Sequence, residues 1–434
     1  MTKPIVITGV SLYGEETADL VIAKGQIASL SKSDAPSGAT TVDGKGLVAL
    51  PGLVDPHPHL REPGKEDAET IETGSRAAVA GGYVAVHAMA NTTPVADTAG
   101  VVEQVRRKGI EVGLVDVFPV GAVTIGLKGE TLAELGAMAQ SEARVRVFSD
   151  DGMCVGDPVL MRRALEYVKT FDGVIAQHAQ DPRLTEGSQM HEGVVSSALG
   201  LTGWPAVAEE SIIARDILLA EHVGSRVHVL HLSTARSVDI VRWGKSRGID
   251  VTAEATPHHI SLTDENARGY DARFKVNPPL RPESDVEAVR AGIVDGTIDV
   301  IGTDHAPHPD EDKDGEWANS AFGMIGLETS VGVVQKTLID TKRLTWRDVA
   351  RLMSEAPARL CRVEDRHGRP LAAGEPANVT LVDPKRPWVV DPRTMASRSH
   401  NSPFAGQEMP GTVVATLLRG AFTHRHPSWG GSST

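Results

Sequence analysis

Residues 54–64 read VDPHPHLREPG and follow the apolar run at residues 47–50. Such a run is typical of a buried strand, and two histidines one residue apart, His57 and His59, come where it would end. On a strand, residues i and i+2 point to the same face, so both imidazoles can address one metal ion. Arg61 stands where its guanidinium could bind a carboxylate through two hydrogen bonds. The alternative is a loop with two solvated histidines, and matching ligands downstream would decide against it.

The composition excludes several classes of protein. A chain of 434 residues suits one large catalytic domain with a smaller satellite. The formal net charge of −13 argues against a nucleic-acid partner, because phosphate backbones are held by clustered Lys and Arg. Cys154 and Cys361 are the two cysteines, which excludes a disulfide framework and fits a reducing compartment. No stretch has the length and apolarity of a membrane span, so we expect a cytoplasmic protein without a membrane partner.

The two ends of the chain carry short β-like runs separated by turn residues. Neither end has enough strands to cover both faces of a sheet, so we predict that residues 1–50 and 363–434 share one small β-sandwich. The predicted strands at the two ends are 5–7, 20–23, 26–30, the run before Pro51, 377–382, 388–390 and 412–419.

Residues 51–362 instead alternate strands with helices. The predicted strands are the run through His59, 83–86, 112–117, 145–148, 173–176, 227–230, 251–254 and 298–301. The predicted helices are 67–80, 158–170, 209–222, 234–247 and 285–295. Eight such units predict an α/β fold with a closed parallel barrel, whose active site lies at the C-terminal ends of the strands.

Polar residues stand at several of these strand ends. His231 directly follows an apolar run, His178 follows another after Gln177, and Asp304 follows the last one. Together with the first two histidines they offer nitrogen and oxygen donors without thiolate, which favours zinc or a neighbouring borderline metal. A pair of metals about 3.5 Å apart, bridged by hydroxide and by a carboxylate, fits this set. Asp150 and Asp151 compete for the bridging position, and Asp151 is favoured.

Seven sequence blocks carry a resemblance to a known family. They are DPHPHLREPG (55–64), GGY (81–83) leading to AMANTTPV (88–95), FSDDG (148–152), HLST (231–234), KVNPPLR (275–281), TDHAPH (303–308) and FGMIGLET (322–329). These blocks span most of the chain, which resembles the amidohydrolase superfamily and, within it, the class I dihydroorotases. The resemblance implies a distorted TIM (β/α)8 barrel flanked by a small β-sandwich formed by both termini.

The resemblance also implies roles for the metal-site residues. His57 and His59 would bind one zinc ion, and His178 and His231 the second. Asp304 would both contact metal and move the proton. Many relatives bridge the metals with a carbamylated lysine on the fourth strand, but no lysine stands there in this chain. The resemblance therefore implies Zn²⁺, two ions per chain, with Asp151 as the bridge and no carbamylated lysine.

The implied reaction is the reversible cyclisation of N-carbamoyl-L-aspartate to (S)-dihydroorotate in pyrimidine biosynthesis, with Asp304 as general acid and base. Arg61 would hold the substrate carboxylate. The other implied substrate contacts are Asn91, Asn277, His308 and the backbone of Phe322 and Gly323. Taken alone, Asn91 is better explained as a turn residue and Asn277 equally well as part of a rigid loop.

Two rival functions and one open structural question accompany this prediction. A hydantoinase or allantoinase would lack a substrate carboxylate for Arg61, and a non-catalytic scaffold for aspartate transcarbamoylase should have lost metal ligands. By the resemblance we expect a homodimer, and association with aspartate transcarbamoylase is left open. The charged segment 309–319 is expected to be a solvated connection, with a lid over the substrate as the alternative.

Overall fold

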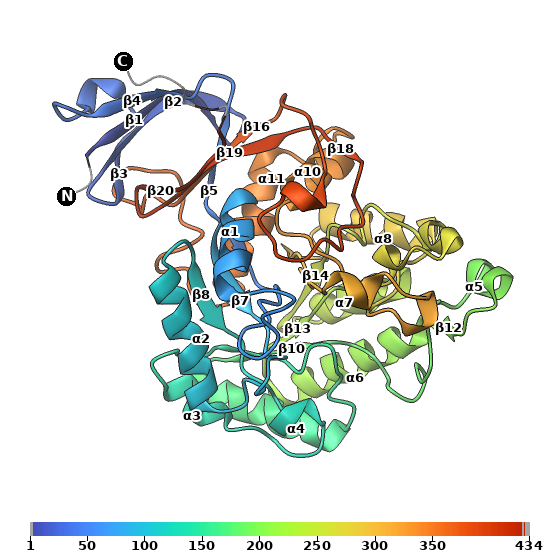
Figure 1. Ribbon diagram of the computed structural model, residues 1–434. Helices are drawn as coiled ribbons and strands as arrows, with labels where there is room; N and C mark the ends of the chain where they lie inside the picture. Colours follow the sequence, from blue (N-terminus) through green and yellow to red (C-terminus); the bar gives the residue numbers. More distant parts are fainter. Residues whose placement is uncertain (1–2, 428, 430–434) are drawn as a thin grey trace.

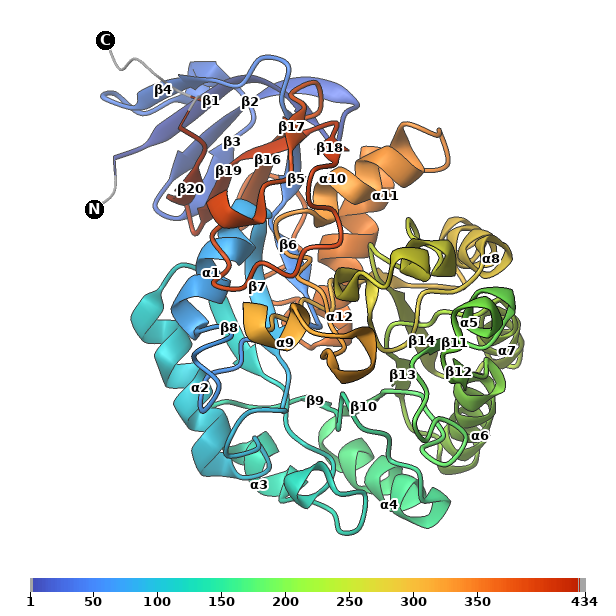
Figure 2. The ribbon, with the colours of Figure 1, turned by 45° about the vertical axis from the view of Figure 1, so that its right-hand side comes forward.

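The computed structural model describes residues 3–427 and 429. Two parts are apparent in Figures 1 and 2: a β-rich part that holds both ends of the chain, and a larger part in which helices surround parallel strands. The ends of the two predicted sandwich segments, residues 1–2, 428 and 430–434, lie outside the described residues.

Strands from both ends of the chain pair in one eight-stranded sheet. Its order is β20-β19-β16-β5-β1-β2-β3, with β4 paired to β1. Strands from the two ends of the chain therefore pair in one sheet, and two of its strands, β4 and β20, were not predicted. Their bounds are β1 Ile5–Leu12, β2 Glu16–Ala23, β3 Gln26–Ser29, β4 Thr40–Asp43, β5 Val48–Pro51, β16 Val379–Asp383, β19 Thr412–Leu418 and β20 Ala421–Arg425.

The predicted strand at 388–390 does not join this sheet. Strand β17 (Trp388–Val389) pairs only with β18 (Glu408–Met409), antiparallel and apart from the main sheet. By contrast, all seven residues of β19 are buried. Helix α1 (Ile71–Ala80) contacts β19, and Oγ1 of Thr416 donates to the main-chain oxygen of Val79 at 2.6 Å. This contact joins the terminal sheet to the helical layer.

Eight parallel strands form the second part in two sheets. One sheet has the order β6-β7-β8 and the other β15-β14-β13-β10-β9. A bridge between Gly121 and Phe148 joins β8 to β9, and a bridge between Pro58 and His305 joins the segments after β6 and β15. The pairings thus run round all eight strands. The bounds are β6 Leu53–Asp55, β7 Tyr83–Ala88, β8 Asp116–Pro119, β9 Val147–Phe148, β10 Val174–Gln177, β13 Val227–Val229, β14 Val251–Ala255 and β15 Val300–Ile301.

Helices lie outside these strands in Figure 2, and several begin where the sequence supplies a cap. Asp157 accepts from the main-chain nitrogen of Leu160, and Thr234 accepts from that of Ser237, contributions of about 1 kcal/mol each. The remaining helices are α2 Ala99–Val112, α3 Leu135–Gln140, α4 Pro158–Val168, α5 Val194–Leu199, α6 Val207–Val223, α7 Ala235–Ser246, α8 Glu283–Val294, α9 Asp310–Lys313, α10 Ser330–Val334, α11 Trp346–Ala350 and α12 Ala356–Leu360. A further short pair, β11 (Met190–His191) and β12 (Gly203–Trp204), lies between α4 and α6.

Within residues 51–362, three predicted elements differ from the structure by more than two residues at one end. The helix predicted at 67–80 begins at Ile71, because Thr70 is its N-cap in a capping box with Thr73. The strand predicted at 112–117 begins at Asp116, because α2 extends to Val112 and ends at Gly113 in a left-handed conformation. The run through His59 is not one strand: β5 belongs to the terminal sheet, and β6 ends at Asp55.

Apolar side chains from the strands form a buried cluster with the segment that begins at α12. It includes Val54, Ala85, Val147, Ala176, Leu230 and Val300 from the strand region, together with Ala358, Leu360, Cys361 and Val363. This cluster packs the strands against the segment 358–363.

Candidate metal centre

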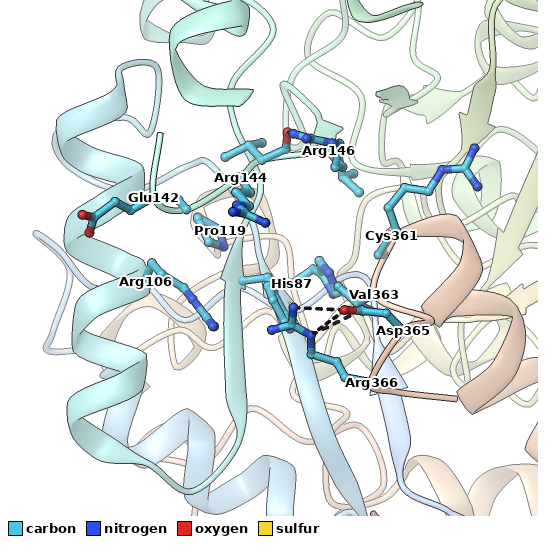
Figure 3. Close-up of a pocket in the computed structure, with 15 residues that line it drawn as sticks. His87, Arg106, Pro119, Glu142, Arg144, Arg146, Cys361, Val363, Asp365 and Arg366 are labelled. Carbon is cyan, nitrogen blue, oxygen red and sulfur yellow. Dashed lines mark hydrogen bonds and ion pairs between the residues drawn. The ribbon is translucent and has the colours of Figure 1, made fainter. Parts of the chain in front are cut away.

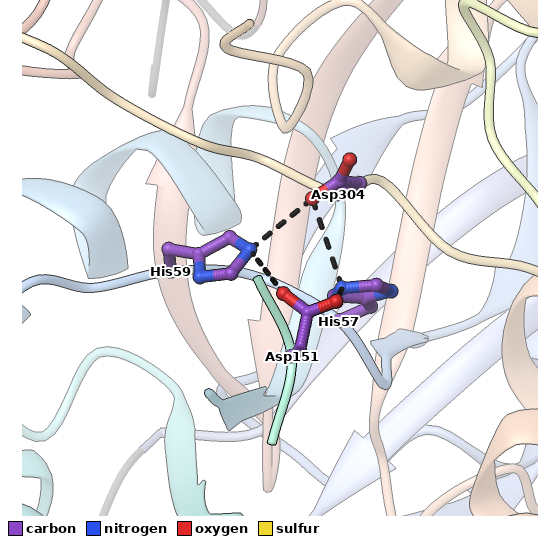
Figure 4. A group of neighbouring side chains, drawn as sticks. All are labelled: His57, His59, Asp151 and Asp304. Atoms are coloured by element: carbon purple, nitrogen blue, oxygen red, sulfur yellow. Dashed lines mark hydrogen bonds and ion pairs between the residues drawn. The ribbon is translucent and has the colours of Figure 1, made fainter. Parts of the chain in front are cut away.

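Six side chains that follow strand ends meet in one buried cluster. His57 and His59 follow β6, Asp151 follows β9, and His178 comes directly after β10. The other two members are His231, after β13, and Asp304, after β15. None of the six is more than 4% exposed. One group that could hold a cation comprises His57, His59, Asp151 and Asp304, and a second comprises Asp151, His178 and His231. Figure 4 shows the first group.

Asp151 is common to both groups. Its Oδ1 lies 3.1 Å from Nδ1 of His178 and 3.2 Å from Nε2 of His231. The same oxygen is 3.4 Å from Nε2 of His57, and Oδ2 is 3.2 Å from Nε2 of His59. A carboxylate that faces histidines on both sides has the geometry of a bridging ligand.

Asp150, the alternative bridge, points elsewhere. Its Oδ1 accepts from the main-chain nitrogens of Val123 at 2.8 Å and Thr124 at 3.0 Å, and its Oδ2 accepts from the hydroxyl of Thr124. These bonds tie the segment after β9 to the segment after β8. Asp150 therefore supports the loop, and Asp151 faces the histidines.

Two observations indicate that the cluster could accommodate metal ions. Nε2 of His57 is buried without a hydrogen-bond partner, and it faces carboxylate oxygens of Asp151 and Asp304 at 3.4 and 3.7 Å. Nδ1 of His178 and Nε2 of His231 lie 2.8 Å apart, as two nitrogens directed at one point. Imidazole and carboxylate donors of this kind are typical of zinc sites.

Two buried carboxylates that the sequence did not single out position these ligands. Oε1 of Glu254, on β14, lies 2.7 Å from Nδ1 of His57, and Glu254 itself is fully buried. Burial alone would raise the pKa of Glu254, but the charges of His57 and His228 and their hydrogen bonds lower it to about 2. Asp55 accepts from the main-chain nitrogens of His57 at 3.2 Å and Thr303 at 3.0 Å, which holds the ends of β6 and β15 together.

The backbone around these residues is strained or has little free space. Asp304 has φ +45° and His231 has φ +30°, which are unfavourable for residues other than glycine. At Gly302, an added Cβ would lie 2.4 Å from Oε2 of Glu254, so only glycine fits beside the buried carboxylate. Burial alone would raise the pKa of Asp304, but the hydrogen bond from His59 and the charge of His57 lower it. Asp304 is therefore ionised near pH 7.

Four of the predicted substrate residues lie together. Nε of Arg61 donates to the main-chain oxygen of Pro307 at 3.0 Å, and Nη2 lies 3.3 Å from Nε2 of His308. The His308 ring in turn donates to the main-chain oxygen of Phe322 at 2.8 Å. A Cβ at Gly323, which has φ +145°, would come within 2.9 Å of both His308 and the oxygen of Ala306. Arg61 is buried, and burial lowers its pKa to about 10, so it remains charged.

Of the two predicted asparagines, Asn91 contacts the metal cluster directly and Asn277 is linked to it through Gln180. Oδ1 of Asn91 lies 2.9 Å from Nδ1 of His59. Asn277 donates through Nδ2 to Oε1 of Gln180 at 3.0 Å, and the same oxygen is 2.7 Å from Nε2 of His178. Oδ1 of Asn277 is buried without a partner. Gln180, two residues after His178, was not predicted, because a lone glutamine carries no metal-site signal.

The expectation that segment 309–319 is a solvated connection is wrong for two of its residues. Lys313 is 6% exposed and Trp317 is 4% exposed. Nζ of Lys313 donates to the main-chain oxygens of Lys275, Ala321 and Gly323 at 2.8–3.1 Å. These hydrogen bonds attach α9 to the segment that contains Phe322 and Gly323.

Comparison with solved structures identifies the fold. An L-hydantoinase (dihydropyrimidinase) from Arthrobacter aurescens superimposes with a TM-score of 0.86 at 24% identity, covering 97% of this chain and 96% of that one. A dihydropyrimidinase from Brevibacillus agri gives a TM-score of 0.84 at 20% identity, covering 99% of this chain and 96% of that one. At these identities the similarity shows that the fold is shared and nothing more.

Sequence comparison is more specific. A "Dihydro-orotase-like" family model matches residues 46–237. A dihydroorotase from Streptomyces coelicolor is 62% identical, with 98% of each chain covered, and one from Mycobacterium tuberculosis is 53% identical, covering 97% of this chain and 98% of the relative. The chain therefore belongs to the dihydroorotase family of the amidohydrolase superfamily. Within the described residues, no helix has both the length and the apolarity needed to cross a membrane.

Proposed function

We propose that this protein is a class I dihydroorotase that interconverts N-carbamoyl-L-aspartate and (S)-dihydroorotate plus water in de novo UMP biosynthesis. The observation that carries the proposal is the buried guanidinium of Arg61 near the metal cluster, in a chain 62% identical to a named dihydroorotase. Of the cyclic substrates considered, dihydroorotate has the carboxylate that this guanidinium would bind.

The proposed centre would hold about two Zn²⁺ ions, with Asp151 as the ligand common to both groups and without a carbamylated lysine. His57 and His59 would hold one ion and His178 and His231 the other, with Asp304 beside them. Such ions supply a hydroxide nucleophile at neutral pH and polarise the ring carbonyl.

The protein's own residues orient the substrate and move its protons. Asp304 accepts a proton from the attacking water and delivers it to the leaving ring nitrogen, and in synthesis it takes the ureido proton. Arg61 fixes the carboxylate, and Asn91 can donate through Nδ2 because its Oδ1 faces His59. Asn277, His308 and the main chain of Phe322 and Gly323 form the rest of the proposed pocket.

The proposal extends to architecture and assembly. Residues 51–362 would form a distorted TIM (β/α)8 barrel, with residues 1–50 and 363–434 folded as a β-sandwich against it. We expect a cytoplasmic homodimer that can associate with aspartate transcarbamoylase.

The test compares substrates and one variant. Purified enzyme should hydrolyse dihydroorotate faster than 5-substituted hydantoins, and Asp304→Asn should lose at least about a thousandfold in kcat, at the upper end of general-base effects. Faster turnover of the hydantoins would favour a hydantoinase instead. Near-normal turnover by Asp304→Asn with its metal content intact would show that Asp304 is not the general acid and base.

A further inference from the structure

A cavity of 520 Å³ lies apart from the metal cluster, and none of its lining residues belongs to that cluster. Strand β7 contributes His87, helix α2 contributes Arg106, and the end of β8 contributes Phe118 and Pro119. Residues 142–147 and the segment 361–366 form the remaining walls. Figure 3 shows these side chains around a common space.

The cavity exists because two neighbouring strands hardly pair. Among the described residues, the one bridge between β8 and β9 is Gly121 with Phe148, supported by hydrogen bonds from Gly121 to Val147 and from Ser149 to Gly121. Phe118 and Pro119 on one side and residues 145–147 on the other line the cavity. Proline cannot donate a main-chain hydrogen bond, which helps keep this seam unpaired.

The charge of the cavity is opposite to that of the chain. Five arginines and two acidic residues line it, which gives a formal charge of 5 − 2 = +3, whereas the whole chain carries −13. The arginines are Arg106, Arg144, Arg146, Arg362 and Arg366. A cleft with this local charge attracts small anions.

Several of these guanidinium groups retain unused donors. Within the described residues, Arg144 is exposed and its side chain makes no hydrogen bond or ion pair. Arg366 pairs only with its exposed neighbour Asp365, at 3.2 Å, a contact of little energy. Arg106 donates through Nη1 to the main-chain oxygen of Val117 at 2.7 Å, and its guanidinium lies 4.6 Å from the centre of the Phe118 ring.

His87 adds a specific polar atom to the wall. Its side chain is 3% exposed, its ring stacks on Phe118 with centroids 5.0 Å apart, and its Nδ1 has no partner. Burial and the neighbouring His367 lower the pKa of His87 to about 3, so the ring is neutral near pH 7. Nδ1, which is buried without a partner, is therefore the ring atom of His87 that remains available to a ligand.

We propose that this cavity is a binding site for a small phosphorylated metabolite, a phosphate ester whose organic part carries a hydroxyl or N–H group. Arg144 and Arg366 bind the phosphate through paired N–H donors, as guanidinium groups do for planar oxygen pairs. Nδ1 of His87 accepts from the organic part, which lies against Phe118. A volume of 520 Å³ is within the range of small-molecule sites.

Calorimetric titration of the metal-loaded protein at 0.15 M ionic strength tests this proposal. The probes are inorganic phosphate, ribose 5-phosphate and a nucleoside 5′-monophosphate. Arg144→Ala/Arg366→Ala removes two exposed arginines of the cavity, and Arg236→Ala, an exposed arginine on α7, is the matched control. His87→Phe keeps a ring of similar size without the acceptor.

We expect saturable binding of at least one ester, weakened at least tenfold in Arg144→Ala/Arg366→Ala and unchanged in Arg236→Ala. His87→Phe should weaken ester binding and leave the weaker binding of inorganic phosphate unchanged. Absence of saturable binding for all three probes would overturn the proposal, as would equal affinity in the double variant. Inorganic phosphate binding as tightly as both esters would overturn the assignment to an ester. None of these readouts depends on dihydroorotase activity.

Discussion

Nδ1 of His57 lies 2.7 Å from Oε1 of Glu254, on the opposite side of the imidazole from the nitrogen that faces Asp151. A neutral metal-binding histidine that donates its second N–H to a carboxylate is held in one tautomer and one orientation. Glu254 also lies 3.3 Å from the main-chain nitrogen of His231, so one buried carboxylate supports ligands of both metal groups.

Glu254→Gln should therefore reduce zinc affinity by about 10- to 100-fold, because the amide no longer fixes the His57 tautomer. Competition with a chelator, followed by metal analysis, measures the change. Glu209→Gln is the control, since Glu209 is also buried and accepts from Ser233 at 3.0 Å without touching a ligand side chain. Equal zinc affinity in both variants would show that the contact between Glu254 and His57 does not contribute to metal binding.

The two neighbouring aspartates after β9 should behave differently. Asp151→Asn should release most of the bound metal, since its carboxylate faces histidines of both groups. Asp150→Asn should keep the metal and lower the free energy of unfolding by about 1–3 kcal/mol, because it weakens bonds to Val123 and Thr124. Metal content and urea unfolding of the two variants separate these roles. Metal loss confined to Asp150→Asn would reverse the assignment.

Arg61→Lys tests carboxylate recognition. Lysine keeps the charge but loses the paired geometry, so KM for dihydroorotate should rise at least about tenfold with a smaller change in kcat. Steady-state kinetics on dihydroorotate and on its amide, which lacks the carboxylate, provide the measurement. An equal rise in KM for both substrates would show that Arg61 does not recognise the carboxylate.

Glu328 gives a prediction about pH. Burial raises its pKa to about 7, although the main-chain nitrogens of Ala396 and Ser397 donate to it. The folded protein therefore favours the protonated form. The corresponding stability is complete below about pH 4.5 and is lost as pH rises through about 7, by up to about 3 kcal/mol.

Glu328→Gln should remove that pH dependence, so the variant should gain stability relative to the native protein between pH 5 and pH 8. Urea unfolding at both pH values measures this difference. Glu16→Gln, an exposed site, is the control. Parallel stability curves for native protein and Glu328→Gln would contradict the prediction.

Local sequence patterns predicted the strands and the histidines at their ends. His57, His59, His178 and His231 follow apolar runs, so their convergence could be expected once eight parallel strands were inferred. Glu254 could not be found in this way, because its partner His57 is 197 residues distant and nothing local distinguishes it from a strand-end carboxylate. Asp55 was read as part of the His-x-His stretch, yet it bonds to Thr303, 248 residues away.

The errors in the fold also have physical causes. Helix α2 was missed because its glycines and charged residues obscure the apolar stripe, yet Gly109 allows close packing, since a Cβ there would lie 2.4 Å from Val117. The segment 309–319 contains mostly charged residues and was read as solvated, but Lys313 satisfies three main-chain carbonyls in the interior. Charge alone did not indicate exposure, because the partners are backbone groups.

The most direct test of the proposed metal-dependent dihydroorotase is metal content measured together with activity in both directions. The account predicts about two zinc ions per chain, hydrolysis of dihydroorotate at alkaline pH and cyclisation of N-carbamoyl-L-aspartate at acidic pH. Chelation should abolish both activities, and zinc should restore them without added bicarbonate. Full activity in protein with almost no metal, or a fully loaded protein with no activity in either direction, would contradict the account.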